Sequence, residues 1–129
     1  MPKPEGPLTY WQLEVMEVVW DLEEASVAEI WEHLAEGREV ARTTILTQVQ
    51  RLEARGWLKR KPRSRPALFR ATRPRDAALA GEADEFLDTY FEGSAAALVQ
   101  NLLGAGKLDK SEVARLRKLL AARAPRRSS

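Results

Sequence analysis

Residues 57–72 constrain the fold more than any other part of this chain. Two short runs, WLKRK and ALFRAT, alternate apolar with polar or basic side chains, and the turn PRSRP separates them. Alternation with a period of two is typical of β-strands, and Pro and Ser between two such runs favour a turn. The sequence therefore predicts a β-hairpin whose proline-bracketed tip is stiff and exposed.

Three amphipathic helices are predicted before the hairpin. Capping boxes mark the starts of the first two: Thr9 with Gln12, and Ser26 with Glu29. The third helix, residues 42–55, repeats apolar residues at helical spacing and turns one stripe inward: Ile45, Val49 and Leu52. Gly56 ends this helix. Three helices followed by a β-hairpin form the layout of a winged helix-turn-helix domain.

Charge is concentrated in the same part of the chain. Residues 38–75 carry twelve basic and two acidic side chains, a net charge of +10, whereas the whole chain has a net charge of only +2. The preceding residues, 1–37, have a net charge of −8. A localised basic segment of this kind is what a phosphate-binding surface needs.

The outward face of the 42–55 helix has side chains suited to reading DNA. A helix that enters the major groove buries one face and presents short polar or basic side chains on the other. We predict base contacts from Thr43, Thr47 and Gln50, with Thr44 and Leu46 beside them. We predict phosphate contacts from Arg42, Arg51 and Arg55 of the helix and from Lys61, Arg63 and Arg65 of the hairpin; Arg51 can also reach a guanine edge. Each prediction has an alternative. The polar face of the helix can be an ordinary solvated surface, and the charges of the hairpin can serve to prevent its edge strands from pairing with another chain.

From Pro74 onward the sequence predicts three more amphipathic helices. Together they span about fifty residues, which is marginal for an independent core. We expect this part to pair with a second copy of the chain, and packing against the N-terminal domain is the alternative. The predicted dimerisation residues are Leu79, Phe86, Leu87, Tyr90, Leu98, Leu102, Leu116, Leu119 and Leu120.

These patterns predict a mostly α chain in four parts. A flexible lead covers residues 1–7, a winged-helix DNA-binding domain residues 8–75, a helical dimerisation domain residues 76–123, and a disordered tail residues 124–129. The winged helix comprises three helices and a β-hairpin wing, and the dimerisation domain comprises three helices.

Composition narrows the function classes. The chain has no Cys and a single histidine, His33, so we expect no metal site and no cofactor. No nucleophile elbow or Gly-rich phosphate loop occurs, and we predict neither an enzyme nor a small-molecule substrate. No signal peptide is recognisable, and no apolar run approaches the roughly 20 residues that span a bilayer. We therefore expect a cytoplasmic protein, with its four tryptophans in the core.

The chain resembles the penicillinase-repressor (BlaI/MecI/CopY) family of bacterial transcriptional regulators over about residues 8–120. Motifs in the first half carry part of the resemblance: Leu8-Thr9, Val15-Met16, Val19-Trp20, Thr44-Ile45-Leu46-Thr47, Arg51-Leu52 and Gly56. Motifs in the second half continue it in register: Phe91-Glu92-Gly93-Ser94, Leu98-Val99, Asn101, Glu112, Leu116-Arg117 and Leu119-Leu120.

The resemblance implies a homodimeric repressor that binds a palindromic operator. Members linked to antibiotic resistance are cleaved in the C-terminal half after a membrane sensor-protease detects a β-lactam, and the cleaved bond corresponds to Asn101-Leu102. Three departures stand out. Ala41 replaces a Ser before the recognition helix, Leu102 replaces a Phe, and the absence of Cys speaks against direct copper sensing.

A competing hypothesis makes the winged helix a protein-interaction module. In that case the basic hairpin docks on an acidic partner instead of on DNA. The two hypotheses differ in whether the chain binds short duplexes at low salt.

Overall fold

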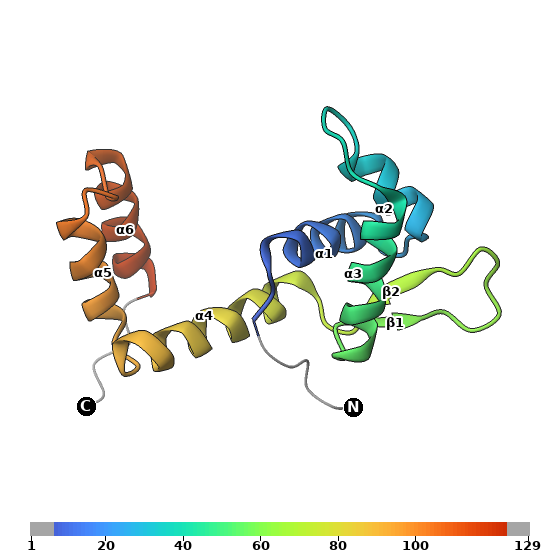
Figure 1. The fold of residues 1–129 in the computed structure, drawn as a ribbon. Helices are drawn as coiled ribbons and strands as arrows, with labels where there is room; N and C mark the ends of the chain where they lie inside the picture. Colours follow the sequence, from blue (N-terminus) through green and yellow to red (C-terminus); the bar gives the residue numbers. More distant parts are fainter. Residues whose placement is uncertain (1–6, 124–129) are drawn as a thin grey trace. The chain divides into compact units, whose positions relative to one another are not determined.

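The computed structural model describes residues 7–123 (Figure 1). The elements follow in the order α1 (Tyr10–Leu22), α2 (Val27–Leu34), α3 (Arg42–Ala54), β1 (Leu58–Arg60), β2 (Phe69–Ala71), α4 (Arg75–Phe91), α5 (Ala95–Gly104) and α6 (Lys110–Arg123). This order confirms the predicted fold class of three helices, a hairpin wing and three further helices. The tail predicted at residues 124–129, and all but the last residue of the lead predicted at 1–7, lie outside the described residues.

The chain divides into two compact units, Met1–Glu82 and Ala83–Ser129, so that α4 runs from the first unit into the second. The core of the first unit draws on all three N-terminal helices and both strands. Its largest fully buried side chains are Phe69, Met16, Ile30, Ile45, Leu52, Val15, Val19 and Val49. Trp57 is buried with them, and Trp11, Trp20 and Trp31 pack half-buried against this cluster, as predicted for core rather than base-stacking residues.

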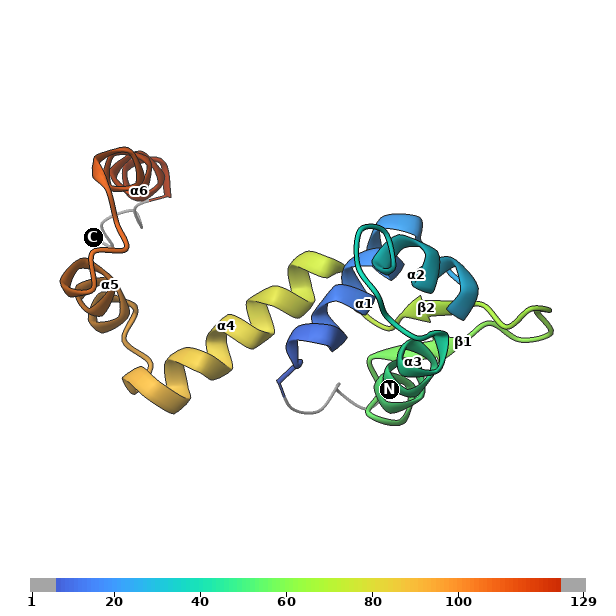
Figure 2. The same cartoon turned by 45° about the horizontal axis from the view of Figure 1, so that its top comes forward.

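The hairpin wing is fixed to the helices at its base. β1 and β2 pair antiparallel, with Lys59 opposite Arg70. Ala25, in the turn between α1 and α2, then exchanges two backbone hydrogen bonds with Phe69, at 3.0 and 2.8 Å. The strands are shorter than the alternating runs that predicted them, because pairing beyond Arg60 consists of one hydrogen bond, from Lys61 N to Leu68 O at 2.8 Å. In both Figure 1 and Figure 2 the loop between the strands projects beyond the helices of this unit.

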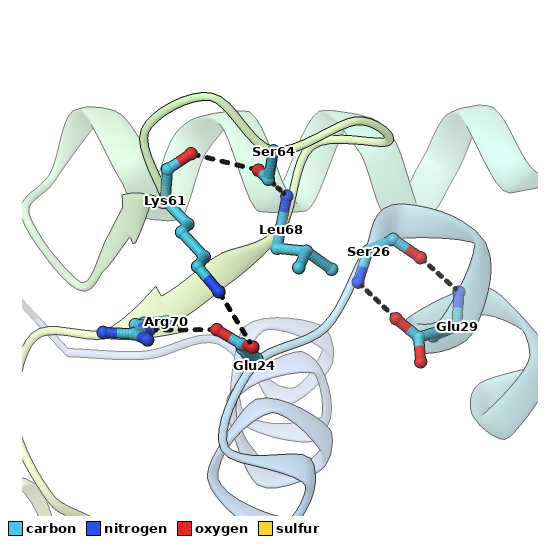
Figure 3. Close-up of polar contacts among 7 residues, drawn as sticks. All are labelled: Glu24, Ser26, Glu29, Lys61, Ser64, Leu68 and Arg70. Carbon is cyan, nitrogen blue, oxygen red and sulfur yellow. Dashed lines mark hydrogen bonds and ion pairs between the residues drawn. The ribbon is translucent and has the colours of Figure 1, made fainter.

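Both predicted capping boxes form. The Thr9 and Gln12 side chains each accept a hydrogen bond from the other residue's backbone N–H, at 3.2 and 3.1 Å. Ser26 and Glu29 do the same at 3.2 and 2.9 Å (Figure 3). Each satisfied N-cap stabilises its helix by about 1 kcal/mol.

The start of α4 is part of the first unit. Ala78 is buried in the core. The Trp20 indole donates to the carbonyl of Arg73 at 2.9 Å, Arg75 forms an ion pair with Glu17 at 2.9 Å, and Glu82 accepts from the backbone N–H of Leu8 at 3.1 Å. The predicted boundary after residue 75 falls where α4 begins, and the first unit continues to residue 82.

The second unit buries very little of its apolar surface. Among the described residues 83–123, no side chain is fully buried. Its helices nevertheless have local start signals: Ser94 accepts from Ala97 N at 3.0 Å, and Asp109 accepts from Glu112 N at 2.9 Å. Sequence-local hydrogen bonds therefore define these helices better than a shared core does.

Candidate nucleic-acid interface

The third helix separates its two faces as the sequence predicts. Ile45, Val49 and Leu52 are fully buried against the core of the first unit. The opposite face carries the residues predicted to contact bases or phosphates, and all of them are exposed to solvent: Arg42, Thr43, Thr44, Leu46, Thr47, Gln50 and Arg51. Apart from Leu46, the side chains on this exposed face are polar or basic, and the opposite face of the helix packs into the core.

The start of α3 has no side-chain cap. Ala41 occupies the N-cap position and offers only its carbonyl, which accepts from Thr44 N at 3.0 Å and from Ile45 N at 3.4 Å. The first-turn N–H groups therefore lack the acceptor that a Ser would supply. The Arg42 guanidinium lies over the Trp31 ring, 5.0 Å from its centroid, so a cation is held at this positive end of the helix.

The Thr47 hydroxyl is already partly committed. It donates to the backbone carbonyl of Thr43 at 3.0 Å. Its remaining capacity is to accept a hydrogen bond and to present its methyl group. An acceptor of this kind suits the amino group of adenine or cytosine, and the methyl suits a thymine methyl.

The last turn of α3 is tied to the first turn of α1. Gln12, only 4% exposed, accepts from Arg55 Nη1 at 2.8 Å and donates to Gln48 Oε1 at 3.3 Å. Arg55 also donates to the carbonyl of Pro7 at 2.9 Å. Arg55, predicted as a phosphate contact, is therefore half-buried among acceptors of the protein itself. Gln12 was predicted only as a capping residue, although a glutamine on an apolar face is a signal for a buried hydrogen-bond partner.

The structure sorts the cations of the hairpin into two sets. The paired set forms ion pairs with the helical body: Arg60 with Glu53 at 3.7 Å, Lys61 with Glu24 at 3.3 Å and Arg70 with Glu24 at 3.1 Å. The unpaired set, which has no ion pair to any described residue, is Lys59, Arg63 and Arg65. The predicted phosphate contacts therefore divide: Arg63 and Arg65 lie exposed in the loop, whereas Lys61 is engaged at its base.

The wing loop is closed by one hydroxyl group. Ser64 Oγ accepts from Leu68 N at 2.9 Å and donates to Lys61 O at 3.0 Å (Figure 3). Arg63 has a positive φ of 59°, so the chain reverses at this residue. These contacts hold the two exposed arginines of the loop on a short closed turn.

Glu24 was missed by sequence analysis. Its carboxylate lies between Lys61, which follows β1, and Arg70 of β2 at the base of the wing (Figure 3). Hydrogen bonds from Arg70 and then from Lys61 hold the pKa of Glu24 below its ordinary value. In the sequence Glu24 is one acid among nine in an acidic segment, so nothing local marked it.

The residues predicted for dimerisation lie on all three C-terminal helices and are exposed or half-buried. Phe86, Tyr90 and Leu120 are 47%, 70% and 69% exposed. The others predicted for this role are Leu79, Leu87, Leu98, Leu102, Leu116 and Leu119; Leu79 belongs to the first unit and the rest to the second. Phe86 contacts Tyr90 with ring centroids 5.1 Å apart. The Asn101-Leu102 bond lies inside α5, with Asn101 exposed and Leu102 half-buried.

Over residues 7–123 no group of three or more acidic or histidine side chains is arranged to hold a metal ion. None of the described helices is both long enough and apolar enough to cross a membrane. His33 is exposed on α2, with Nδ1 3.0 Å from the carbonyl oxygen of Glu29.

Comparison with known proteins gives one family and one fold. A family model described as penicillinase repressor matches residues 8–122. No curated protein matches the chain.

Among solved structures, wild-type apo MarR from E. coli has 23% identity and a TM-score of 0.51, over 92% of this chain and 79% of that one. Bordetella bronchiseptica BpsR, described in a study of its regulation by 6-hydroxynicotinic acid, has 24% identity and a TM-score of 0.48, over 89% and 74%. The likeness to MarR supports the winged-helix fold alone.

Proposed function

The chain belongs to the penicillinase repressor family, and from that premise we propose that it is a cytoplasmic, dimeric repressor that binds a palindromic operator. Membership confirms the resemblance found in the sequence. The family is one of DNA-binding winged-helix transcription repressors, so the prediction of a regulator and not an enzyme is also confirmed. The dimeric state, the palindromic operator and the roles of the single residues go beyond family membership and are proposed here.

The observation that carries the proposal is that the exposed polar face of α3 lies in the same unit as the wing loop, whose arginines form no ion pair with any described residue. Thr43, Thr47 and Gln50 read base edges in the major groove, with Thr44 and Leu46 beside them. Gln50 can pair with both N6 and N7 of adenine, and Thr47 serves as an acceptor and methyl contact. The fully buried opposite face of α3 supports this role, because it fixes the register of the reading side chains.

Phosphate contacts come from exposed cations that form no ion pair with any described residue. Arg63 and Arg65 on the wing loop, with Arg51 and Arg42 on α3, neutralise backbone charge and set orientation without reading sequence. Arg55 and Lys61 are engaged within the protein, so we propose that their main role is to hold α3 and the wing in place.

The dimer forms through the C-terminal helices. The absence of any buried side chain among described residues 83–123 supports this, because a lone unit of this size leaves its leucines and aromatics in water. A second copy supplies the missing apolar surface. Two linked winged helices then bind two half-sites with far greater avidity than either binds alone.

Control by proteolysis is the further part of the proposal taken from the resemblance. Cleavage at Asn101-Leu102 by a membrane sensor-protease would cut α5 and separate the dimerising leucines on either side. The bond is helical here, with Asn101 O accepting from Ala105 N at 3.0 Å, so α5 must open locally before a protease can bind it. Incubating the chain with such a protease and sequencing the fragments tests this step.

The central experiment defines the operator and then removes one reader. Selection from a random duplex library gives the preferred site, and fluorescence anisotropy measures affinity for that site and for random duplex. Thr47→Ala should lower operator affinity roughly tenfold, in line with about 1–3 kcal/mol for a base contact, and leave random duplex nearly unchanged. Thr89→Ala, an exposed threonine on α4, is the matched control. Equal losses on both duplexes would show that Thr47 does not read sequence.

A further inference from the structure

The base of the wing carries an acidic residue that the proposed DNA contacts do not use. Glu24 stands in the turn between α1 and α2, next to Ala25, whose backbone pairs with Phe69 of β2. This backbone pairing sets Glu24 beside the hairpin whatever its charge. Its two carboxylate oxygens take different partners: Oε1 pairs with Lys61 at 3.3 Å and Oε2 with Arg70 at 3.1 Å (Figure 3).

The two partners of Glu24 lie on opposite sides of the hairpin. Lys61 follows β1, and Arg70 lies within β2. One carboxylate therefore spans the base of the wing and neutralises two of the cations on it. The Glu24 side chain is 32% exposed and those of its partners 41% and 49%, so all three groups are open to solvent.

We propose that Glu24 is a specificity-determining residue of this protein: it withholds Lys61 and Arg70 from DNA phosphates and so restricts phosphate contact by the wing to its loop. This inference rests on the proposed DNA-binding function. Nonspecific binding to duplex is electrostatic and grows with each cation that reaches a phosphate. In the operator complex the base contacts fix the register of the protein, so Lys61 and Arg70 gain only the phosphates that lie within reach at that register, whereas on a random duplex the protein is free to take the register that pairs the most cations. A carboxylate that occupies two wing cations therefore lowers affinity for random DNA more than affinity for the operator.

The salt dependence of binding reports this withholding directly. Each additional phosphate neutralised steepens the slope of log K against log salt by about 0.9. Glu24→Gln keeps the size of the side chain, removes its charge and releases both cations. We expect the slope on random duplex to steepen by about 0.9 to 1.8 and the affinity at low salt to rise severalfold. Operator affinity should rise less, so the ratio of operator to random affinity falls.

The control for charge alone is Glu17→Gln. Glu17 is an exposed carboxylate that pairs with one arginine, Arg75, at the start of α4 and contacts no residue of the wing. It changes net charge by the same amount. Glu24→Asp restores a carboxylate at the wing and should return the slope toward that of the wild type. Circular dichroism confirms that each variant is folded, which is expected because exposed ion pairs contribute little to stability.

The measurement uses the full chain, a labelled random duplex and the selected operator, from about 50 to 200 mM KCl. A steeper slope for Glu24→Gln than for Glu17→Gln, with a lower operator-to-random ratio, supports the inference. Equal slopes for the two variants would overturn it, as would an affinity loss on both duplexes without a change in slope, which indicates a purely structural residue. A wild-type chain that does not prefer its selected operator would instead refute the proposed function.

Discussion

Removing the Gln12 side-chain amide should loosen the attachment of α3 to α1. Gln12 Oε1 accepts from Arg55 Nη1 at 2.8 Å and from Thr9 N at 3.1 Å, and Nε2 donates to Gln48 at 3.3 Å. Gln12→Met keeps the volume of this buried side chain but removes all three hydrogen bonds. A hydrogen bond to a charged group contributes about 1.5–3 kcal/mol and a neutral one about 0.5–1.5 kcal/mol. Since Arg55 and Thr9 can regain water at the rim of the unit, we expect a net loss of about 2–3 kcal/mol.

Urea unfolding followed by tryptophan fluorescence measures this loss, because all four tryptophans lie in the first unit. Chain concentration is held fixed, since dimerisation would shift the apparent stability. Gln50→Met is the matched control: it makes the same substitution on the exposed face of α3, where a change stays within about 0.5 kcal/mol. Gln12→Glu keeps both acceptor contacts and should cost less than Gln12→Met. If Gln12→Met is no more destabilising than Gln50→Met, the inferred attachment of α3 to α1 is wrong.

Three further outcomes follow from particular contacts. Ala41→Ser supplies the missing N-cap of α3 and should raise the free energy of unfolding by about 0.5–1 kcal/mol in the same urea assay; no gain would mean that the first turn is already satisfied. Phe86→Glu puts a charge on the exposed aromatic face of α4 and should shift sedimentation equilibrium from dimer to monomer, and an unchanged mass would argue against that face as the interface. Because folding lowers the pKa of Glu24, its stabilising effect is complete above the ordinary value and is lost as pH falls through the lowered one. Carbon-detected NMR titration should therefore give Glu24 a pKa below that of an ordinary glutamate, and Arg70→Met should raise this pKa.

Much of the fold could be predicted because its signals are local. The capping boxes at Thr9 and Ser26 act across three residues, and the inward stripe of α3 repeats every three or four. The hairpin follows from alternation on either side of a proline-bracketed turn. Signals of such short range do not depend on tertiary contacts. The predicted helices and wing therefore lie close to their observed positions.

The candidate DNA surface was predicted only as a set of residue types. In the sequence Arg55, Lys61, Arg63 and Arg65 are equivalent candidates for phosphate contact, since each is a cation in a basic segment. The structure distinguishes them by partners far away in the chain. Arg55 meets Gln12 across 43 positions and Lys61 meets Glu24 across 37, whereas Arg63 and Arg65 have no ion pair to any residue from 7 to 123.

The sequence by itself determined the elements, their order and the concentration of positive charge in residues 38–75. Periodicity, caps and turns are properties of neighbouring residues, and they needed no tertiary contact to be recognised. Only the tertiary structure decided which cations are paired within the protein and which face solvent. The physical reason is that an ion pair or a buried hydrogen bond depends on distance in space, and the fold, through the Ala25–Phe69 pairing and the packing of α3 on α1, brings Glu24 and Gln12 to their partners.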